Sequence, residues 1–226
     1  MPDDLQTPTV HRTGAPPPSV VFFDLGGVVV DVELDRARRA WSDAMGTGPE
    51  DFDRVFFESG IKDRMDIGRL GTSEALGEIQ ALLGGSIDEA LVVRCWSSSL
   101  SPRPRVSELI RKVAASTRCA VISNTDPLHA ATIEAQGGIA GVVERWVYSY
   151  QAGCLKPHSG IFELALRHLG VRAEETLLVD DRQDNLAAAR ELGMDGLHYD
   201  SFETLRRGMA ERGLIEPGWL PGQPRP

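Results

Sequence analysis

The sequence predicts an α/β protein with a doubly wound, mostly parallel sheet and an all-helical segment inserted after the first strand. Short apolar runs without polar alternation, which are typical of strands buried on both faces, alternate with helical patterns along most of the chain. Residues 32–101 break this alternation, because helical patterns follow one another there without a convincing strand. Since this stretch starts just past the first strand, we expect it to form a cap over the carboxyl edge of the sheet.

Three apolar runs predict the central strands, and weaker runs predict two more. The central runs cover residues 20–23, 119–122 and 176–179, and the weaker ones 146–148 and 196–199. Helical patterns lie at residues 104–116, 128–136, 159–169 and 186–192. Gly170 and Gly193 follow the last two patterns, where glycine commonly ends a helix.

The cap is predicted to contain four helices. They cover residues 34–45, 49–58, 72–83 and 86–96, and the last opens on a capping box from Ser86 to Glu89. We expect the cap core to hold the aromatic residues Trp41, Phe56, Phe57 and Trp96. Some polar residues at the start of the cap could face the site, but we prefer a solvated helix face for Asp31, Asp35, Arg36 and Arg39.

These patterns also place the domain boundaries. A chain of 226 residues suits one domain that carries a sizeable insertion. We expect a core of residues 19–31 and 102–215, a cap of residues 32–101, a disordered segment of residues 1–18, and a Pro-rich tail of residues 216–226.

Charge limits the partners. The chain has 24 Lys and Arg against 33 Asp and Glu, a formal charge of −9, and no basic run interrupts this acidity. Nucleic acid and membrane are therefore poor partners, and a phosphorylated substrate needs a metal ion or a few placed cations. We find no signal peptide or transmembrane segment. The three cysteines match no zinc spacing and cannot pair evenly, which favours a reducing, cytoplasmic setting.

Polar clusters follow the predicted strands in a fixed order. They are Asp24 with two glycines, Ser123-Asn124-Thr125, Lys156-Pro157, and Asp180-Asp181 followed by Asn185. Each cluster alone has an ordinary structural interpretation: a glycine turn, a helix cap or a solvated loop. The adjacent carboxylates of Asp180 and Asp181 are harder to explain, because they repel each other unless a cation or hydrogen-bond donors lie between them.

In their order and local context these clusters resemble the haloacid dehalogenase (HAD) superfamily of aspartyl-phosphate hydrolases. The resemblance covers residues 19–212 and rests on F-D-L-G-G-V-V-V-D, V-I-S-N-T, L-K-P-H-S-G-I-F and V-D-D-R-Q-D-N-L-A-A-A-R-E-L-G-M. It is closest to the helical-cap sugar-phosphate phosphatases and the phosphatase domain of soluble epoxide hydrolases. It implies a Rossmann-like core and hydrolysis of a small phosphorylated metabolite, such as a sugar phosphate, through an aspartyl-phosphate intermediate.

The resemblance and the chemistry of the residues together suggest roles. Asp24 would be the nucleophile that attacks phosphorus. Mg²⁺ would be bound by the Asp24 carboxylate, the Gly26 carbonyl and Asp181. Asp180 would act indirectly, and Asn185 would orient Asp181 or a bound water.

Phosphoryl transfer also needs donors for the spread negative charge. Lys156 would contact both the nucleophile and a phosphate oxygen. The Ser123 hydroxyl and the backbone N–H groups of Asn124 and Leu25 would hold the other oxygens. Pro157 is expected to set the start of the following helix.

Gly26 departs from the family pattern. Most phosphatases of this family have a second Asp there, two residues after the nucleophile, as general acid and base. Glycine has no side chain for either task, so activity on poor leaving groups could fall about 10²- to 10⁴-fold. We expect surface or capping roles for His129 and His158, and an inert thiol at Cys154.

Two alternative functions remain. A metal-independent 2-haloacid dehalogenase would use the same nucleophile, although it gains nothing from paired acids at Asp180 and Asp181. A non-catalytic binding or regulatory module is favoured only by Gly26. The sequence leaves monomer and homodimer equally open.

Overall fold

The central sheet has five parallel strands. The computed structural model describes residues 16–85 and 87–222 of the chain, and it orders the strands β5-β4-β1-β6-β7. The central strand β1 (Val20–Phe23) pairs with β4 (Arg118–Ser123) and β6 (Thr176–Asp180), while β5 (Arg145–Tyr148) and β7 (Asp195–His198) form the edges. The predicted parallel α/β fold is therefore confirmed.

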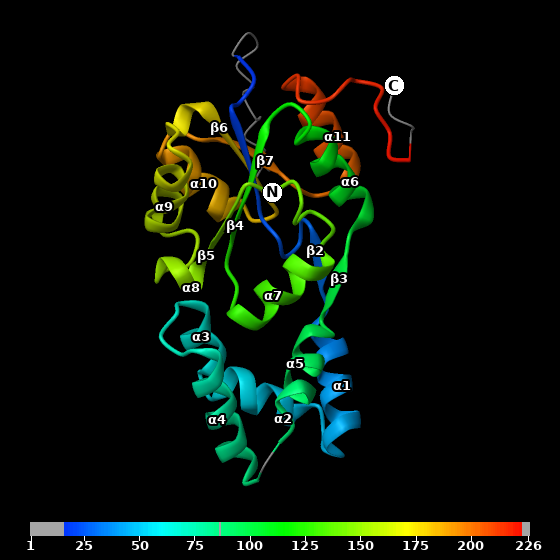
Figure 1. Cartoon of the computed structure of the whole chain (residues 1–226), viewed down its shortest axis with the longest axis vertical. Helices are drawn as coiled ribbons and strands as arrows, with labels where there is room; N and C mark the ends of the chain where they lie inside the picture. The colour runs from blue at the N-terminus through cyan, green and yellow to red at the C-terminus, as the bar shows by residue number, and fades with distance from the viewer. Residues whose placement is uncertain (1–15, 86, 223–226) are drawn as a thin grey trace, which may run out of the picture.

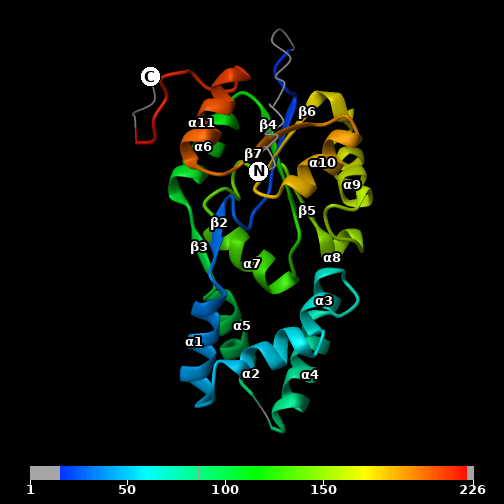
Figure 2. The same ribbon diagram turned by 180° about the vertical axis from the view of Figure 1, so that it is seen from behind.

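Helices cover both faces of the sheet (Figures 1 and 2). Val21 and Phe23 of β1 pack in a cluster with α6 (Pro104–Val113), α7 (Pro127–Gln136) and α11 (Phe202–Glu211). The intervening side chains of Val20 and Phe22 pack with α9 (Ser159–Leu169) and α10 (Gln183–Glu191) on the opposite face. Because both faces are buried, the strand sequence is a continuous apolar run rather than an alternating one.

The helical segment, residues 33–99, is inserted between two short antiparallel strands, β2 (Val30–Val32) and β3 (Leu100–Pro102). Its helices are α1 (Leu34–Met45), α2 (Glu50–Asp53), α3 (Ile61–Asp66), α4 (Thr72–Leu83) and α5 (Glu89–Ser97), and α2 continues as a π-helical turn over Arg54–Glu58. The prediction that residues 32–101 contain no strand was wrong at both ends of this range, where β2 and β3 pair. These strands have only three residues each, too few to give a periodic pattern.

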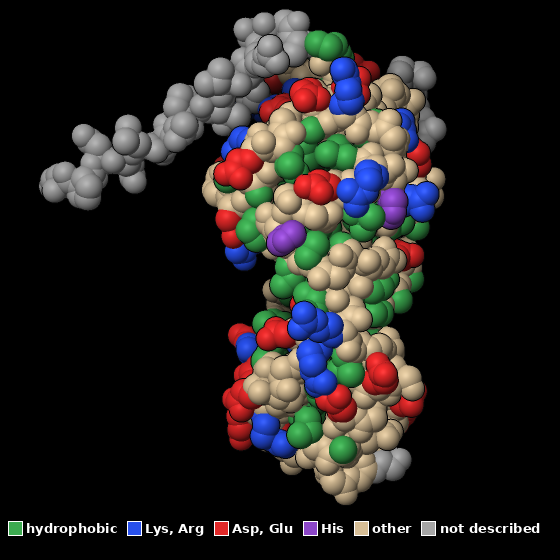
Figure 3. All heavy atoms as spheres, turned by 90° about the vertical axis from the view of Figure 1, so that its left-hand side faces the viewer, with side chains coloured by type: hydrophobic (Ala, Val, Ile, Leu, Met, Phe, Trp, Pro, Cys, Tyr) green, Lys and Arg blue, Asp and Glu red, His purple; other side chains and the backbone are tan. Residues whose placement is uncertain are grey.

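The helical segment has its own hydrophobic core. Trp41, Phe56 and Trp96 are buried there, and Phe57 is partly buried against them, as expected. The rings of Phe56 and Trp96 are stacked with centroids 4.6 Å apart. Figure 3 shows the molecule narrowing between this segment and the sheet, with hydrophobic side chains at the narrow part.

Some local expectations differ from the structure. The helix α5 begins at Glu89, with the Asp88 carboxylate accepting from the backbone N–H of Ala90. Ser86, the first residue of the expected capping box, lies outside the described residues, as do residues 1–15 and 223–226. Helices α3, α8 (Ser149–Ala152) and α11 and a 3₁₀ turn (Ala173–Glu175) were not predicted.

The described part of the C-terminal tail packs on the core. Glu216 pairs with Lys112 of α6 at 2.9 Å, and Trp219 lies against the hydrophobic cluster beneath α6 and α11. The backbone N–H of Gly222 donates to Glu108 in α6. Among residues 16–85 and 87–222, no helix has the length and apolar character needed to cross a membrane.

Candidate active site

The polar clusters meet at the carboxyl edge of the sheet. In the register of the sheet, Phe23 of β1 lies opposite Val121 of β4 and Val179 of β6. Because the three strands are parallel, the residues that follow these positions end at one edge. This register brings together Asp24, Ser123 and Asp180, while the loop between α8 and α9 adds Lys156.

Lys156 lies at the centre of this group. Its Nζ atom is 2.9 Å from Asp24 Oδ1 and 2.7 Å from Asp180 Oδ2, and it donates to the carbonyl of Ile122 at 3.0 Å. All three charged side chains are buried. Burial lowers the pKa of Lys156, but the two carboxylates outweigh it and raise that pKa above its ordinary value. The ammonium therefore stays charged between the two acids.

The pKa of Asp24 is raised to about 6. Burial is the main cause; Lys156 lowers the pKa and the repulsion from Asp180 raises it. The backbone N–H of Leu25, which we expected to face a phosphate, donates to Asp24 Oδ1 at 2.6 Å in this structure. The carboxylate is thus held by one ammonium and one amide donor.

Asn124 has a function that sequence reasoning missed. Its side-chain Nδ2 donates to the carbonyl of Lys156 at 2.9 Å, and its Oδ1 accepts from the backbone N–H of Lys156 at 2.7 Å. From the sequence, we expect a role only for the backbone N–H of Asn124. The sequence shows only an amide side chain beside Ser123. It does not indicate the partner, because Lys156 lies 32 residues further along the chain.

The acidic cluster consists of Asp24, Asp180 and Asp181. One oxygen from each lies within 4.8 Å of the others. Asp180 is fully buried, and it accepts from the backbone N–H of Arg182, the Asn185 amide and Lys156 at 2.7–2.9 Å. Asp181 is half-exposed, and its pKa is raised by burial and by Asp180.

The expected contact between Asn185 and Asp181 was wrong. Asn185 donates to Asp180 instead, because alternate side chains of a strand share a face. Leu178 of β6 packs with Leu186 of α10, so Asp180 two residues later points toward the same helix. The Oδ1 atom of Asn185 is buried and has no hydrogen-bond partner among the described residues.

The donor set fits a magnesium ion. Carboxylate and carbonyl oxygens are the ligands that Mg²⁺ prefers. Gly27 adopts φ +80°, and a Cβ atom there would overlap the carboxylate of Asp181. The loop after β1 and the end of β6 therefore lie close together, and the unpartnered Asn185 Oδ1 can accept from a water molecule.

Other predicted residues lie outside this group. His158 is the N-cap of α9, with Nδ1 accepting from the N–H of Gly160, as the capping role predicted. Helix α9 begins at Ser159, so Pro157 is not its first residue. His129 is buried, and the surface or capping interpretation was wrong for it. Its ring stacks on Trp96, a partner that is distant in the sequence.

The polar residues at the start of the helical segment contact their neighbours. Asp31 pairs with Arg103, and Arg36 donates to Ser101. Asp35 pairs with Arg38 on the exposed side of α1, and Arg39 is exposed. Local pairing and solvent therefore account for this face.

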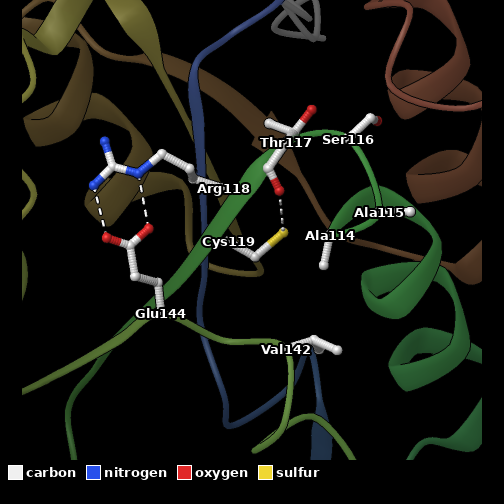
Figure 4. A pocket seen from close by; sticks show the side chains of 8 residues that line it. All are labelled: Ala114, Ala115, Ser116, Thr117, Arg118, Cys119, Val142 and Glu144. Carbon is white, nitrogen blue, oxygen red and sulfur yellow. Dashed lines mark hydrogen bonds and ion pairs between the residues drawn. The ribbon is translucent and has the colours of Figure 1, made fainter.

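A surface hollow of about 370 Å³ lies at the amino end of β4, at the edge opposite Asp24 (Figure 4). Arg118 and Glu144 on its wall form an ion pair at 2.8 Å. Burial raises the pKa of the Cys119 thiol beside them to about 12. A paired charge and an unreactive thiol offer no chemistry here.

Known proteins share this fold. The chain is 26% identical over 185 residues to D-ribitol-5-phosphate phosphatase of Bacteroides thetaiotaomicron, covering 77% of this chain and 88% of that protein. A HAD family enzyme of the same organism, solved with magnesium and inorganic phosphate, has a TM-score of 0.72 at 21% identity, covering 80% and 93% of the two chains. L-2-haloacid dehalogenase of Xanthobacter autotrophicus has a TM-score of 0.58 at 20% identity, covering 88% and 84%.

A family model also matches most of the chain. It describes the haloacid dehalogenase-like hydrolases and matches residues 18–193. This stretch includes the whole helical segment and every cluster at the carboxyl edge of the sheet. The chain belongs to the haloacid dehalogenase-like hydrolase family.

Proposed function

We propose that the protein is a Mg²⁺-dependent phosphatase that hydrolyses a small phosphorylated metabolite. The observation that carries the proposal is Lys156 held between Asp24 and Asp180, with Asp181 beside them. One cation and three carboxylates give the site an excess of negative charge, which a divalent ion would offset. The similarity to a ribitol-phosphate phosphatase favours a sugar or polyol phosphate as the substrate.

In this mechanism Asp24 attacks phosphorus and becomes an aspartyl-phosphate while the alcohol leaves. Lys156 stays charged, so it can hold the nucleophile and a phosphate oxygen together. The Ser123 hydroxyl and the backbone N–H of Asn124 lie where β4 ends and would donate to other phosphate oxygens. Water then cleaves the acyl phosphate and restores Asp24.

Asp24, the carbonyl of Gly26 and Asp181 would hold Mg²⁺, which would neutralise charge between the nucleophile and the phosphate. Asp180 accepts from Lys156, Asn185 and the backbone, so it positions the lysine rather than the ion. Asn185 would bind a water molecule through its free Oδ1.

We also infer that the helical segment is a cap and that the core and cap divide near residues 32 and 101. Two observations support this. The segment leaves the core through the paired strands β2 and β3 beside Gly26. It contacts the core again where α5 meets α7 and where Gly68, just after α3, packs against the backbone of Tyr150 in α8.

A panel of phosphate esters tests the function. With Mg²⁺, purified protein should hydrolyse p-nitrophenyl phosphate rapidly and polyol phosphates more slowly, because Gly26 offers no acid for an alcohol leaving group. EDTA should abolish the turnover of both. Asp24→Asn should be inactive, whereas Asp195→Asn, at the amino end of β7, should keep full activity. Activity in EDTA, or in Asp24→Asn, would overturn the mechanism. Chloride release from 2-chloropropionate would indicate a dehalogenase, and binding of phosphate esters without turnover would indicate a non-catalytic module.

A further inference from the structure

Asp126 joins the helical segment to the loop of the candidate site. It lies three residues after Ser123 and is fully buried. Its Oδ1 atom accepts from the first backbone N–H groups of α7, those of Leu128 and His129, at 2.9 and 3.0 Å. Its Oδ2 atom accepts from Trp96 Nε1 of α5 at 3.1 Å and lies 3.6 Å from Lys62 Nζ of α3. One carboxylate therefore contacts two helices of the segment and the start of a core helix.

His129 extends this network toward the two connections between segment and core. Its Nδ1 atom is 3.4 Å from Asp126 Oδ2, and its ring stacks on Trp96 with centroids 4.4 Å apart and planes 6° apart. Its Nε2 atom is 3.3 Å from Ser99 Oγ. The carbonyl of Ser99 accepts from the backbone N–H of Glu33. This bond links the two connections, because Glu33 follows β2 and Ser99 precedes β3.

Ser99, His129 and Asp126 have the order of a catalytic triad, but their surroundings exclude that role. All three side chains are buried, and the Ser99 hydroxyl also lies 2.9 Å from the carbonyl of Trp96, to which it donates. A nucleophile needs access to substrate and a place for the developing oxyanion. This chain of contacts is structural.

The energetics of Asp126 depend on the docked segment. A buried carboxylate is costly unless charged or hydrogen-bonding groups surround it. Helix α7 supplies two backbone donors, whereas Trp96 and Lys62 come from the helical segment. Burial alone would raise the pKa of Asp126, but the charge of Lys62 and the hydrogen bond from Trp96 help to bring that pKa below its ordinary value, so the group stays ionised. If the segment moved away, the carboxylate would lose two of its partners.

The loop between β4 and α7 can transmit this contact to the site. Ser149 of α8 holds Thr125, accepting from its N–H at 3.0 Å and donating to its carbonyl at 3.1 Å. Asp126 follows Thr125 directly, and its side chain holds the first turn of α7 through the N–H groups of Leu128 and His129. Upstream, Asn124 holds the main chain of Lys156. A shift of Asp126 would therefore reach Asn124 and Ser123 along the main chain of residues 123–126. It would reach Lys156 through the side chain of Asn124.

We propose that Asp126 is a positioning residue that couples docking of the helical segment to the placement of Ser123 and Asn124 at the end of β4. The proposal rests on the proposed phosphatase function, because turnover is one of its readouts. It assigns to Trp96 and Lys62 the task of holding Asp126 when the segment is docked. Asp126 is not part of the acidic cluster, and its contacts are with α3, α5 and α7.

The test uses Asp126→Asn, since asparagine is as good an N-cap as aspartate and keeps an oxygen for α7. The variant loses the second carboxylate oxygen and the charge. We expect kcat for p-nitrophenyl phosphate to fall roughly 10- to 100-fold, with a smaller change in KM. Trp96→Phe keeps the stacked ring but loses the donor, so it should also lower kcat. The fold-loss in kcat of the double variant should be smaller than the product of the two single losses, because both substitutions remove the same hydrogen bond between Trp96 and Asp126.

Ser97→Ala is the matched control. Ser97 Oγ is 2.8 Å from Thr132 Oγ1, so the variant loses another hydrogen bond between α5 and α7 without touching the loop. We expect its kcat to stay within about twofold of the wild type, since a hydrogen bond of this kind contributes little net energy. If Ser97→Ala were as slow as Asp126→Asn, general loosening of the contact would explain both, and the proposal would be wrong.

Hydrogen exchange separates this proposal from the phosphatase function. Without substrate, residues 89–97 and 127–136 should exchange faster in Asp126→Asn than in Ser97→Ala. If the wild type hydrolyses phosphate esters but Asp126→Asn matches it in kcat and exchange, the coupling is wrong and the function stands. If the wild type hydrolyses no ester, the function is wrong. In that case hydrogen exchange alone tests the coupling, and equal protection of residues 89–97 and 127–136 in Asp126→Asn and Ser97→Ala would overturn it.

Discussion

The side chain of Asn185 donates to Asp180 Oδ1 at 2.9 Å and makes no corresponding bond to Asp181. The two adjacent carboxylates therefore have different surroundings. Asp180 is fully buried and has three hydrogen-bond donors, whereas Asp181 is half-exposed and lies against Gly27. A carboxylate whose oxygens already accept from protein donors is a poor ligand, so this difference assigns the metal to Asp181 in our proposal.

We predict that Asp181→Asn weakens Mg²⁺ binding far more than Asn185→Ala does. The first variant removes a charged ligand, and we expect a loss beyond about 100-fold. The second removes a neighbour that orients Asp180 and water, a type of change that costs about 10- to 100-fold at most. Calorimetric titration of the metal-free proteins measures both affinities. Equal losses would mean that the roles of the two aspartates are reversed or shared.

The second prediction concerns Asn124. Asn124→Ala removes both hydrogen bonds to the Lys156 main chain and lets the ammonium drift from Asp24. We expect kcat to fall roughly 10- to 100-fold, because small misplacements of a charged group are costly. The free energy of unfolding should fall by only about 1–2 kcal/mol, the net contribution of two ordinary hydrogen bonds. Steady-state kinetics and urea unfolding measure the two effects, and an unchanged kcat would contradict the positioning role.

The third prediction is a pH dependence of stability that comes from His129. Burial lowers the pKa of this imidazole, and Asp126 only partly offsets the effect. Below the ordinary histidine pKa of 6.5, the unfolded chain binds a proton that the folded chain does not. Stability that His129 contributes at neutral pH is therefore lost as pH falls below this value, by at most about 1.4 kcal/mol per pH unit.

His129→Phe isolates this contribution, since phenylalanine keeps a ring against Trp96 and cannot titrate. Other groups work in the opposite direction, because the raised pKa of Asp24 makes the folded state bind protons as pH falls through about 6. The measurement is therefore the difference in unfolding free energy between variant and wild type from pH 7 to pH 5. That difference should shift in favour of the variant as the pH is lowered. A constant difference would show that His129 does not titrate differently in the two states.

Local patterns predicted much of the fold. The bounds of α1, α4 and α9 match the predicted ranges to the residue, because each has a clear apolar face and a glycine just past its end. The bridging strands β2 and β3 and the one-turn helix α8 were too short to give a period. The helix α11 was missed although Leu205 and Met209 are buried at helical spacing.

The site was predictable where topology decides and unpredictable where long-range packing decides. Parallel strands bring their carboxyl ends together, so the meeting of Asp24, Ser123 and Asp180 followed from the order of apolar runs. To predict that Asn185 contacts Asp180, one must know in which direction the Asp180 side chain points. To predict that His129 is buried, one must know that the ring of Trp96 from the helical segment stacks on it, and no local sequence pattern indicates that contact.

Gly26 leads to the last prediction. A Cβ atom at this position would lie 3.3 Å from Val32 Cγ2, and Gly26 does not have a positive φ. An aspartate therefore fits the backbone there and needs only a small shift of Val32, which is exposed and able to move. Gly26→Asp would restore the carboxylic acid that most phosphatases of the family have at this place.

Without that acid, the natural protein should favour esters whose leaving group needs no proton, such as aryl, acyl and anomeric phosphates, over phosphates of primary alcohols. Gly26→Asp should therefore speed hydrolysis of a primary alkyl phosphate more than that of p-nitrophenyl phosphate, by up to about 10²-fold. Gly26→Asp combined with Val32→Ala should gain more, because the new side chain has room, and Val32→Ala alone is the control. Equal rates on alkyl and aryl esters in the natural protein, with no gain in either variant, would mean that water or another residue already delivers the proton.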